Sequence, residues 1–139
     1  MAEQKSTPTI IIDATSAVLG RLASFAAKQA LLGKKVIIVN CNDILVTGSK
    51  ANIIANFKQK RARGGSAQKG PYYSRTPERI VKRTIRGMLP YTKGRGSESL
   101  DRVICYNTTP REYESEKKIH AGRELRTKAL QLKHLSDIM

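Results

Sequence analysis

The first third of the chain alternates short apolar runs with one longer amphipathic segment. Residues 9–13 (TIIID) form a β-branched run that predicts a buried strand. Residues 16–33 predict a helix with residues 13–16 as N-cap candidates, Gly33 as its C-cap, and one apolar face made of Leu19, Leu22, Ala23, Ala26 and Ala30. Residues 35–41 (KVIIVNC) are apolar without alternation, which is typical of a strand covered on both faces. Strand, helix and strand in this order predict a βαβ unit with parallel strands and a right-handed crossover.

Two further helices are predicted in the middle of the chain. Ser49 can cap a helix whose apolar side carries Ile53, Ile54 and Phe57. The triplet Thr76-Pro77-Glu78 supplies a cap, a proline at the first helical position and an acid in the first turn of a helix that ends near Gly87. This helix is predicted to have an apolar stripe of Ile80, Val81, Ile85 and Met88. Its opposite stripe is basic and consists of Arg79, Lys82, Arg83 and Arg86.

The remaining segments complete an α/β prediction. Residues 42–48 are expected to form a short turn or strand, and residues 102–106 (RVICY) a third main strand. A C-terminal helix is predicted near residues 122–135, where Leu125, Ala129 and Leu132 would dock on the body. We therefore expect one domain over residues 1–139, with a three-layer α/β/α fold around a small, mostly parallel sheet. Its body spans about 8–107, with basic loops at 58–76 and 90–97 and a charged helical tail from about 108 to 139.

Charge separates the middle of the chain from its ends. The 139 residues carry a net charge of +15, from 26 Lys and Arg against 11 Asp and Glu. Residues 58–95 alone hold 12 basic and 1 acidic side chain, a net charge of +11. A charge used only for solubility would be spread over the surface, so this concentration predicts contact with a polyanion.

The basic stretch contains two glycine-rich segments whose chemistry suits phosphate binding. Glycine allows the backbone to approach a phosphate, and cations release counterions when they bind one. Tyr72 and Tyr73 could stack on unpaired bases, although ordinary packing explains them equally well, and a solvated loop is the alternative for the whole segment. The candidate RNA-binding residues are Lys58, Lys60, Arg61, Arg63, Lys69, Tyr72, Tyr73, Arg75, Arg79, Lys82, Arg83, Arg86, Lys93 and Arg95.

Enzymatic signatures are missing from the sequence. Asp13 and the Gly20-Arg21 pair lie where α/β folds often bind nucleotides, but neither phosphate-binding fingerprint, GxGxxG or GxxxxGK[ST], occurs. Asp13 is better explained as a cap or turn residue, whereas Arg21 could also reach RNA. His120 and His134 lack HExxH spacing and a carboxylate partner in the sequence, so we interpret them as surface residues. We expect no catalytic residues, no metal, no cofactor and no small-molecule substrate.

The expected compartment is the cytoplasm. Cys41 and Cys105 lack the CxxC spacing of zinc sites and are expected to be buried, reduced thiols. No segment approaches the roughly 20 apolar residues of a membrane span. The N-terminal MAEQKSTPT lacks the apolar core of a signal peptide.

Three segments together resemble one family. The chain reads IIDATSAVLGRLAS at 11–24, KVIIVN at 35–40 followed by TG at 47–48, and GPYYSRTPERIVKRTIRGMLPYTKGRG at 70–96. These segments resemble ribosomal protein L13, also called uL13, in its archaeal and eukaryotic form. The resemblance covers residues 10 to about 106 and implies a three-layer α/β fold, a place in the large ribosomal subunit, binding to large-subunit rRNA and contacts with neighbouring ribosomal proteins. By this resemblance, the RNA-facing positions include Arg61, Arg63, Arg75, Arg79, Arg83, Arg86, Lys93 and Arg95.

The functional expectation is a structural rRNA-binding protein of the large subunit that supports assembly. Nothing in the chain resembles a zinc finger, an RNP signature or a base-reading helix, so recognition through backbone and shape is expected, which suits folded RNA. Two other classes remain open. One is a basic DNA- or chromatin-binding protein, and the other is an RNA-processing or nucleotide-using enzyme on the same scaffold.

Overall fold

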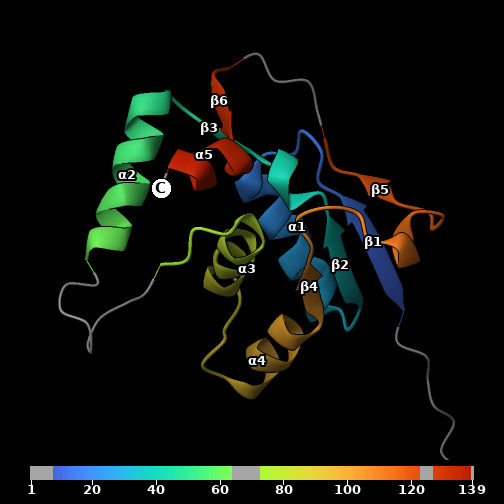
Figure 1. Ribbon diagram of the computed structural model, residues 1–139. Coiled ribbons are helices and arrows are strands. Elements are labelled where there is room, and N and C mark those ends of the chain that lie inside the picture. The colour runs from blue at the N-terminus through green and yellow to red at the C-terminus, as the bar shows by residue number, and fades with distance from the viewer. Residues whose placement is uncertain (1–7, 64–72, 123–126, 139) are drawn as a thin grey trace, which may run out of the picture.

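The computed structural model describes residues 8–63, 73–122 and 127–138 (Figure 1). Its strands are β1 (Thr9–Asp13), β2 (Lys35–Val39), β3 (Leu45–Thr47), β4 (Val103–Cys105), β5 (Ile119–His120) and β6 (Ala129–Gln131). Its helices are α1 (Leu19–Leu31), α2 (Lys50–Ala62), α3 (Pro77–Gly87), α4 (Gly94–Asp101) and α5 (Leu132–Ile138), with 3-10 turns η1 (Cys41–Asp43) and η2 (Arg111–Tyr113). No helix in these ranges is long and apolar enough to cross a membrane.

The predicted βαβ unit forms the centre of the fold. β1 and β2 are parallel neighbours with Ile11 opposite Ile37, and α1 connects them. β4 adds to the far side of β2 and β5 to the far side of β1, so the sheet has the order β4-β2-β1-β5 with every pairing parallel. The third strand expected at 102–106 is thus confirmed as β4.

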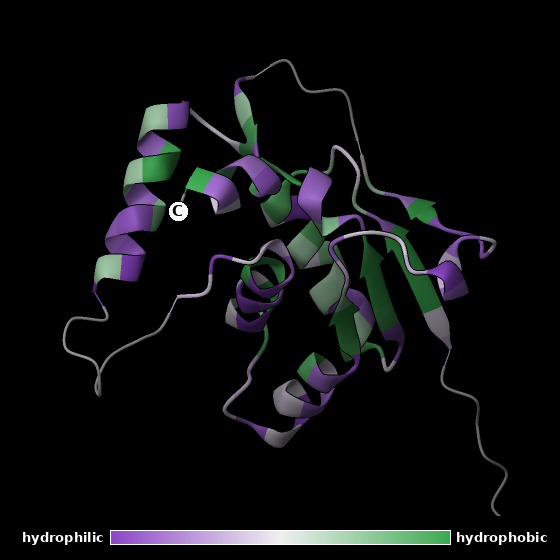
Figure 2. Cartoon of the chain, viewed as in Figure 1, coloured by the Kyte–Doolittle hydropathy of each residue, from purple (hydrophilic) through white to green (hydrophobic). Residues whose placement is uncertain are grey.

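The two faces of the sheet have different covers, which explains the unbroken apolar run in β2. Ile12, Val36 and Ile38 point into the main core, which α1, α3 and α5 complete. On the other face, Ile11, Ile37 and Val39 pack against Tyr106 and Tyr113. In Figure 2 the central strands are mostly green, whereas green and purple alternate along the helices. The three-layer α/β prediction is confirmed, with the second covering layer thin and containing the single turn η2.

The beginning of α1 differs from the prediction. The N-cap is Val18, which makes no side-chain capping bond, rather than one of residues 13–16. Those residues form a turn in which Ser16 has φ 59° and the Asp13 carboxylate accepts two hydrogen bonds from Thr15. The polar side chains are therefore used by the turn before the helix begins. At the other end Gly33, with φ 91°, follows the C-cap Leu32.

The C-terminal segment also differs from the prediction of one helix over 122–135. Residues Ala129–Gln131 instead form β6, which pairs antiparallel with β3 and places Leu130 opposite Val46. The helix α5 begins only at Leu132, which is buried as predicted, whereas Ala129 is exposed. Leu125 lies outside the described residues. Strand pairing with a distant segment has overridden the local helical pattern.

Candidate nucleic-acid interface

Helix α3 carries four cations on one short segment, and it starts where the sequence predicted. Thr76 is its N-cap and Pro77 its first residue. Ile80, Val81 and Ile85 are buried as expected, which fixes the helix on the body. Met88 is 43% exposed, because it lies at the C-cap where the chain turns, and Leu89 takes the inward position instead at 4% exposure.

The basic stripe of α3 is not uniform. Arg79 and Arg86 are exposed, whereas Lys82 and Arg83 are half-buried. The Lys82 ammonium donates a hydrogen bond of 2.8 Å to the carbonyl oxygen of Val103, which ties α3 to β4. Lys82 therefore contributes to the architecture as well as to the charge of this surface.

Tyr73 joins α2 to α3 through its ring. The Arg83 guanidinium lies 4.3 Å from the ring centroid, and the Lys60 ammonium lies 5.6 Å from it. The ring also meets Phe57 edge to face at a centroid distance of 5.9 Å. Cations over an aromatic face are attracted by the ring quadrupole. Tyr73 is thus half-buried between two basic helices, and packing accounts for much of its surface.

A cleft of about 310 Å³ opens beside this contact. Tyr73 and Ser74 line it from the segment before α3, Ile80 and Leu100 supply apolar surface, and the charged lining comes from α3. Its cations are Arg79, Lys82, Arg83 and Arg86. Among the described residues that line the cleft, none is acidic. Four positive side chains around one hollow produce a field that attracts anions such as phosphate groups.

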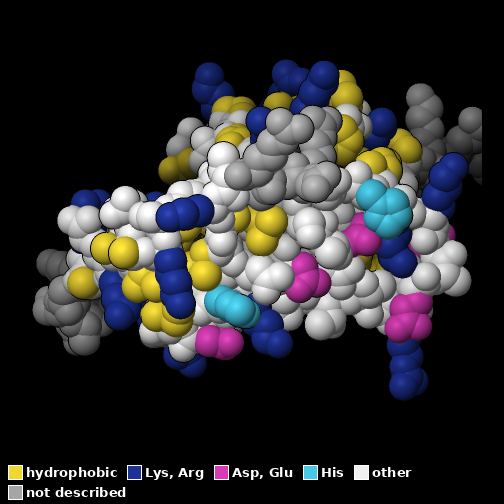
Figure 3. All heavy atoms as spheres, turned by 90° about the horizontal axis from the view of Figure 1, so that it is seen from above, with side chains coloured by type: hydrophobic (Ala, Val, Ile, Leu, Met, Phe, Trp, Pro, Cys, Tyr) yellow, Lys and Arg dark blue, Asp and Glu magenta, His cyan; other side chains and the backbone are white. Residues whose placement is uncertain are grey.

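The first predicted basic loop, 58–76, is partly helical. Lys58, Lys60 and Arg61 lie on α2, and Arg63 is its C-cap. Cations in the last turn of a helix are favoured by the negative end of its dipole, which explains why the helix continues through them. Arg75 is exposed and lies just before α3, whereas Lys69 and Tyr72 are outside the described residues. Figure 3 shows dark blue Lys and Arg side chains beside apolar ones on the left of the molecule, where α2 lies.

The second predicted loop, 90–97, is also shorter than expected, because α4 begins at Gly94 with Lys93 as its N-cap. Lys93 and Arg95 are both exposed. Gly96 has a packing role, since a Cβ at this position would lie 2.0 Å from the carbonyl oxygen of Pro90. The preceding turn therefore packs directly on the backbone of α4.

Tyr91 was missed by the sequence reasoning. Its side chain is 47% exposed, and the Arg86 guanidinium lies 4.9 Å from its ring centroid. The signal in the sequence was an aromatic residue within the basic segment PYTKGRG. The structure therefore provides two arginine–tyrosine pairs on this surface, Arg83 with Tyr73 and Arg86 with Tyr91.

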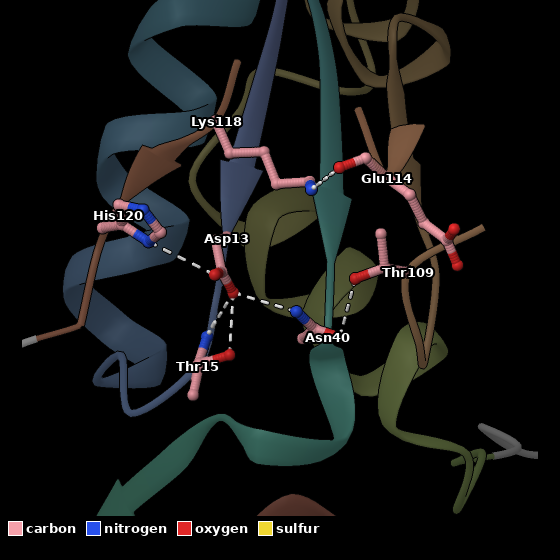
Figure 4. A network of polar contacts seen from close by, with 7 residues as sticks. All are labelled: Asp13, Thr15, Asn40, Thr109, Glu114, Lys118 and His120. Carbon is pink, nitrogen blue, oxygen red and sulfur yellow. Dashed lines mark hydrogen bonds and ion pairs between the residues drawn. The ribbon is translucent and has the colours of Figure 1, made fainter. Parts of the chain in front are cut away.

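A network of polar contacts occupies the ends of the central strands, where α/β folds often bind nucleotides (Figure 4). Asp13 Oδ1 accepts hydrogen bonds from Thr15 and from the Asn40 amide at 3.0 Å, and Asn40 Oδ1 accepts one from Thr109. His120 Nδ1 lies 3.2 Å from Asp13 Oδ2, so His120 has a carboxylate partner that the sequence did not suggest. These contacts join the ends of β1, β2 and β5.

The protonation of Asp13 follows from this network. Burial alone would raise the pKa of Asp13, but the hydrogen bonds from Asn40 and Thr15 and the charge of His120 outweigh it and hold the pKa below its usual value. The carboxylate therefore has a low affinity for a proton and is already engaged in hydrogen bonds, as expected of a turn residue, whereas a general base needs a raised pKa. Within residues 8–63, 73–122 and 127–138, no group of three or more His, Cys, Asp or Glu side chains could hold a metal ion.

Comparison with known proteins gives a consistent result. The sequence model of a family described as ribosomal protein L13 matches residues 7–112, which include α1 to α4. The large ribosomal subunit protein uL13 of Thermoplasma volcanium is 48% identical over 107 residues, which are 77% of this chain and 78% of that protein. The uL13 proteins of Methanosarcina barkeri and Methanocaldococcus jannaschii are 45% and 41% identical, over 73% and 78% of this chain and 73% and 82% of their own lengths. β5, β6 and α5 lie beyond the matched residues.

Proposed function

Because this chain belongs to the ribosomal protein L13 family, we propose that it is a non-catalytic constituent of the large ribosomal subunit that binds and stabilises large-subunit rRNA. In this role it supports assembly of the subunit, contacts neighbouring ribosomal proteins and resides in cytoplasmic ribosomes. Three related proteins carry the name of a large-subunit protein, which supports this assignment.

The observation that carries the RNA-binding proposal is the cleft lined by Arg79, Lys82, Arg83 and Arg86. These cations belong to the segment 58–95, which holds a net charge of +11. Folded RNA presents closely spaced phosphates where helices converge, and a concave basic surface can neutralise several of them at once. The apolar face of α3 anchors this surface in the main core.

The residues have different proposed roles. The exposed Arg79, Arg86 and Arg95 bind phosphate groups directly. Arg83 and Lys60 are positioned by Tyr73, so they present charge on a preformed surface. Tyr91 is the better candidate for stacking on a base, because it is 47% exposed, whereas Tyr73 is half-buried between cations. The other basic residues of 58–95 add charge around this centre.

The two other functional classes have less support. A DNA-binding protein that reads sequence would need a helix presenting Asn or Gln beside Arg to a groove, and the exposed cations of α3 lack such neighbours. A nucleotide-using enzyme would need free polar groups at the strand ends, where Asp13 is instead bound by Asn40, Thr15 and His120.

Sedimentation tests the location of the protein. Native extract is separated on a sucrose gradient, and the protein is followed with an antibody or an affinity tag. We expect it to travel with the large subunit and with whole ribosomes, and to leave them only at high salt. A pool that remains mostly free, or that follows DNA, would contradict the proposal.

A further inference from the structure

The two cysteines, which are far apart in the chain, meet in the fold. Cys41 is the first residue of η1, just beyond β2, and Cys105 is the last residue of β4. β2 and β4 are neighbouring parallel strands with Ile38 opposite Cys105. The backbone N–H of Cys41 donates a 3.1 Å hydrogen bond to the carbonyl oxygen of Tyr106. Because Tyr106 directly follows Cys105, this bond holds the backbone of Cys41 beside the end of β4.

Their surroundings give the two thiols different accessibility. Cys41 is 0% exposed within the main core, whereas Cys105 is half-buried at the margin of the same core. The neighbouring Cys105 thiol, together with burial, raises the pKa of the Cys41 thiol. Thiol–disulfide exchange requires a thiolate that can reach the partner sulfur. A reagent in solution would therefore meet Cys105 first, and Cys41 is placed to react only with Cys105.

We propose that Cys41 and Cys105 form a reversible intramolecular disulfide when the folded protein meets a low-molecular-weight disulfide such as oxidised glutathione. The Cys105 thiolate attacks one sulfur of the oxidant and forms a mixed disulfide, and the first reduced thiol leaves. The sulfur of Cys41 then attacks Cys105 Sγ, and its proton passes to the departing sulfur, so that the second reduced thiol leaves. The two protein thiols lose two protons and two electrons. The protons and the electrons are taken up by the oxidant, which is released as two reduced thiols.

The disulfide would enclose a defined part of the molecule. The chain between Cys41 and Cys105 contains α2, α3 and α4, and with them the whole basic segment 58–95. Linking its two ends would fasten β4 to the turn that follows β2. A cross-link over a loop of this length reduces the entropy of the unfolded chain, so the oxidised protein is the more stable form. The inference does not depend on the proposed RNA-binding function.

Oxidation of the full chain tests the inference. The purified protein is reduced, freed of reductant and incubated in its folded state with excess oxidised glutathione. Intact-mass spectrometry should show the loss of two hydrogen atoms, and peptide mapping should link Cys41 to Cys105. The melting temperature should rise by on the order of 10 °C and return to its first value after reduction.

Two single variants serve as controls. Cys41→Ala should stop at the glutathione adduct on Cys105, without the rise in melting temperature, and Cys105→Ala should leave Cys41 unmodified. If Cys41→Ala does not fold, the mass spectrum of the oxidised wild-type protein still shows whether the disulfide forms. Wild-type protein that ends as the Cys105 adduct, that keeps both thiols free, or that is linked only between molecules would overturn the inference.

Discussion

Replacing the exposed arginines of α3 separates a specific RNA contact from a general effect of charge. Arg79 and Arg86 are exposed and line one cleft, whereas Arg83 is half-buried over Tyr73, so the clean perturbation is Arg79→Gln with Arg86→Gln. Each lost phosphate contact should reduce the slope of log K against log salt by about 0.7–0.9. At about 0.1 M salt this corresponds to a loss of about five- to eightfold in affinity for each arginine, and the difference should vanish near 1 M.

The assay is a titration of a large-subunit rRNA fragment, followed by fluorescence anisotropy at several salt concentrations. The matched control is Lys117→Gln with Lys133→Gln, which removes the same charge from exposed positions outside the basic segment. We expect the control to keep the wild-type slope. The stability of both double variants should stay within about 0.5 kcal/mol of the wild type, because the replaced side chains are exposed. Equal losses of affinity in the two double variants would refute a specific RNA contact at the cleft. Net charge alone would then explain the binding.

Three further predictions concern packing and polar contacts that stabilise the fold. Gly96→Ala should lower the free energy of unfolding by about 1–3 kcal/mol in a urea titration, because the new Cβ would meet the Pro90 carbonyl. Gly94→Ala, where the new Cβ has open space around it, should be neutral or stabilising. Equal effects of the two substitutions would contradict this packing. Tyr73→Ala should lower the melting temperature and weaken rRNA binding more than Tyr73→Phe, which keeps a ring beneath Arg83. If the two variants lose the same stability and affinity, the contact between the ring and Arg83 is not the cause of the loss. Asp13→Asn should cost about 1–3 kcal/mol at pH 7. Because the folded pKa of Asp13 lies below its ordinary value of 3.8, its stabilisation is complete above that pH and is lost as the pH falls through the folded pKa. Chemical unfolding of both proteins from pH 7 to about pH 3 should therefore show a gap that narrows only at the acid end, and a constant gap would disprove the role of the charge.

Much of the candidate surface could be predicted because it depends on local patterns. The cap and proline at residues 76 and 77, the apolar positions of α3 and its four cations all lie within one short segment with helical spacing. The βαβ unit is equally local, since β1, α1 and β2 follow one another with short connections. In these segments the periodicity of apolar residues determines both the element and the face that it buries.

The contacts between distant segments were not predictable in the same way. Arg83 meets Tyr73 and Lys60 only because α2 and α3 converge, and no periodicity encodes that convergence. Residues 58–62 and 94–97 were predicted as loops but are helical. Capping and dipole interactions determine where a helix ends, and they outweigh the local preference of a few glycines or cations.

The sequence by itself determined the parallel α/β core, the two-faced helix α3 and the concentration of positive charge in residues 58–95, because each follows from the order and spacing of neighbouring residues. The tertiary structure alone decided which cations share the cleft, that Lys82 binds the β4 carbonyl, and that Asp13 joins His120 and Asn40. It also placed residues 129–131 in a strand beside β3. Such pairings depend on how whole elements pack, and their energy appears only when residues distant in sequence come together.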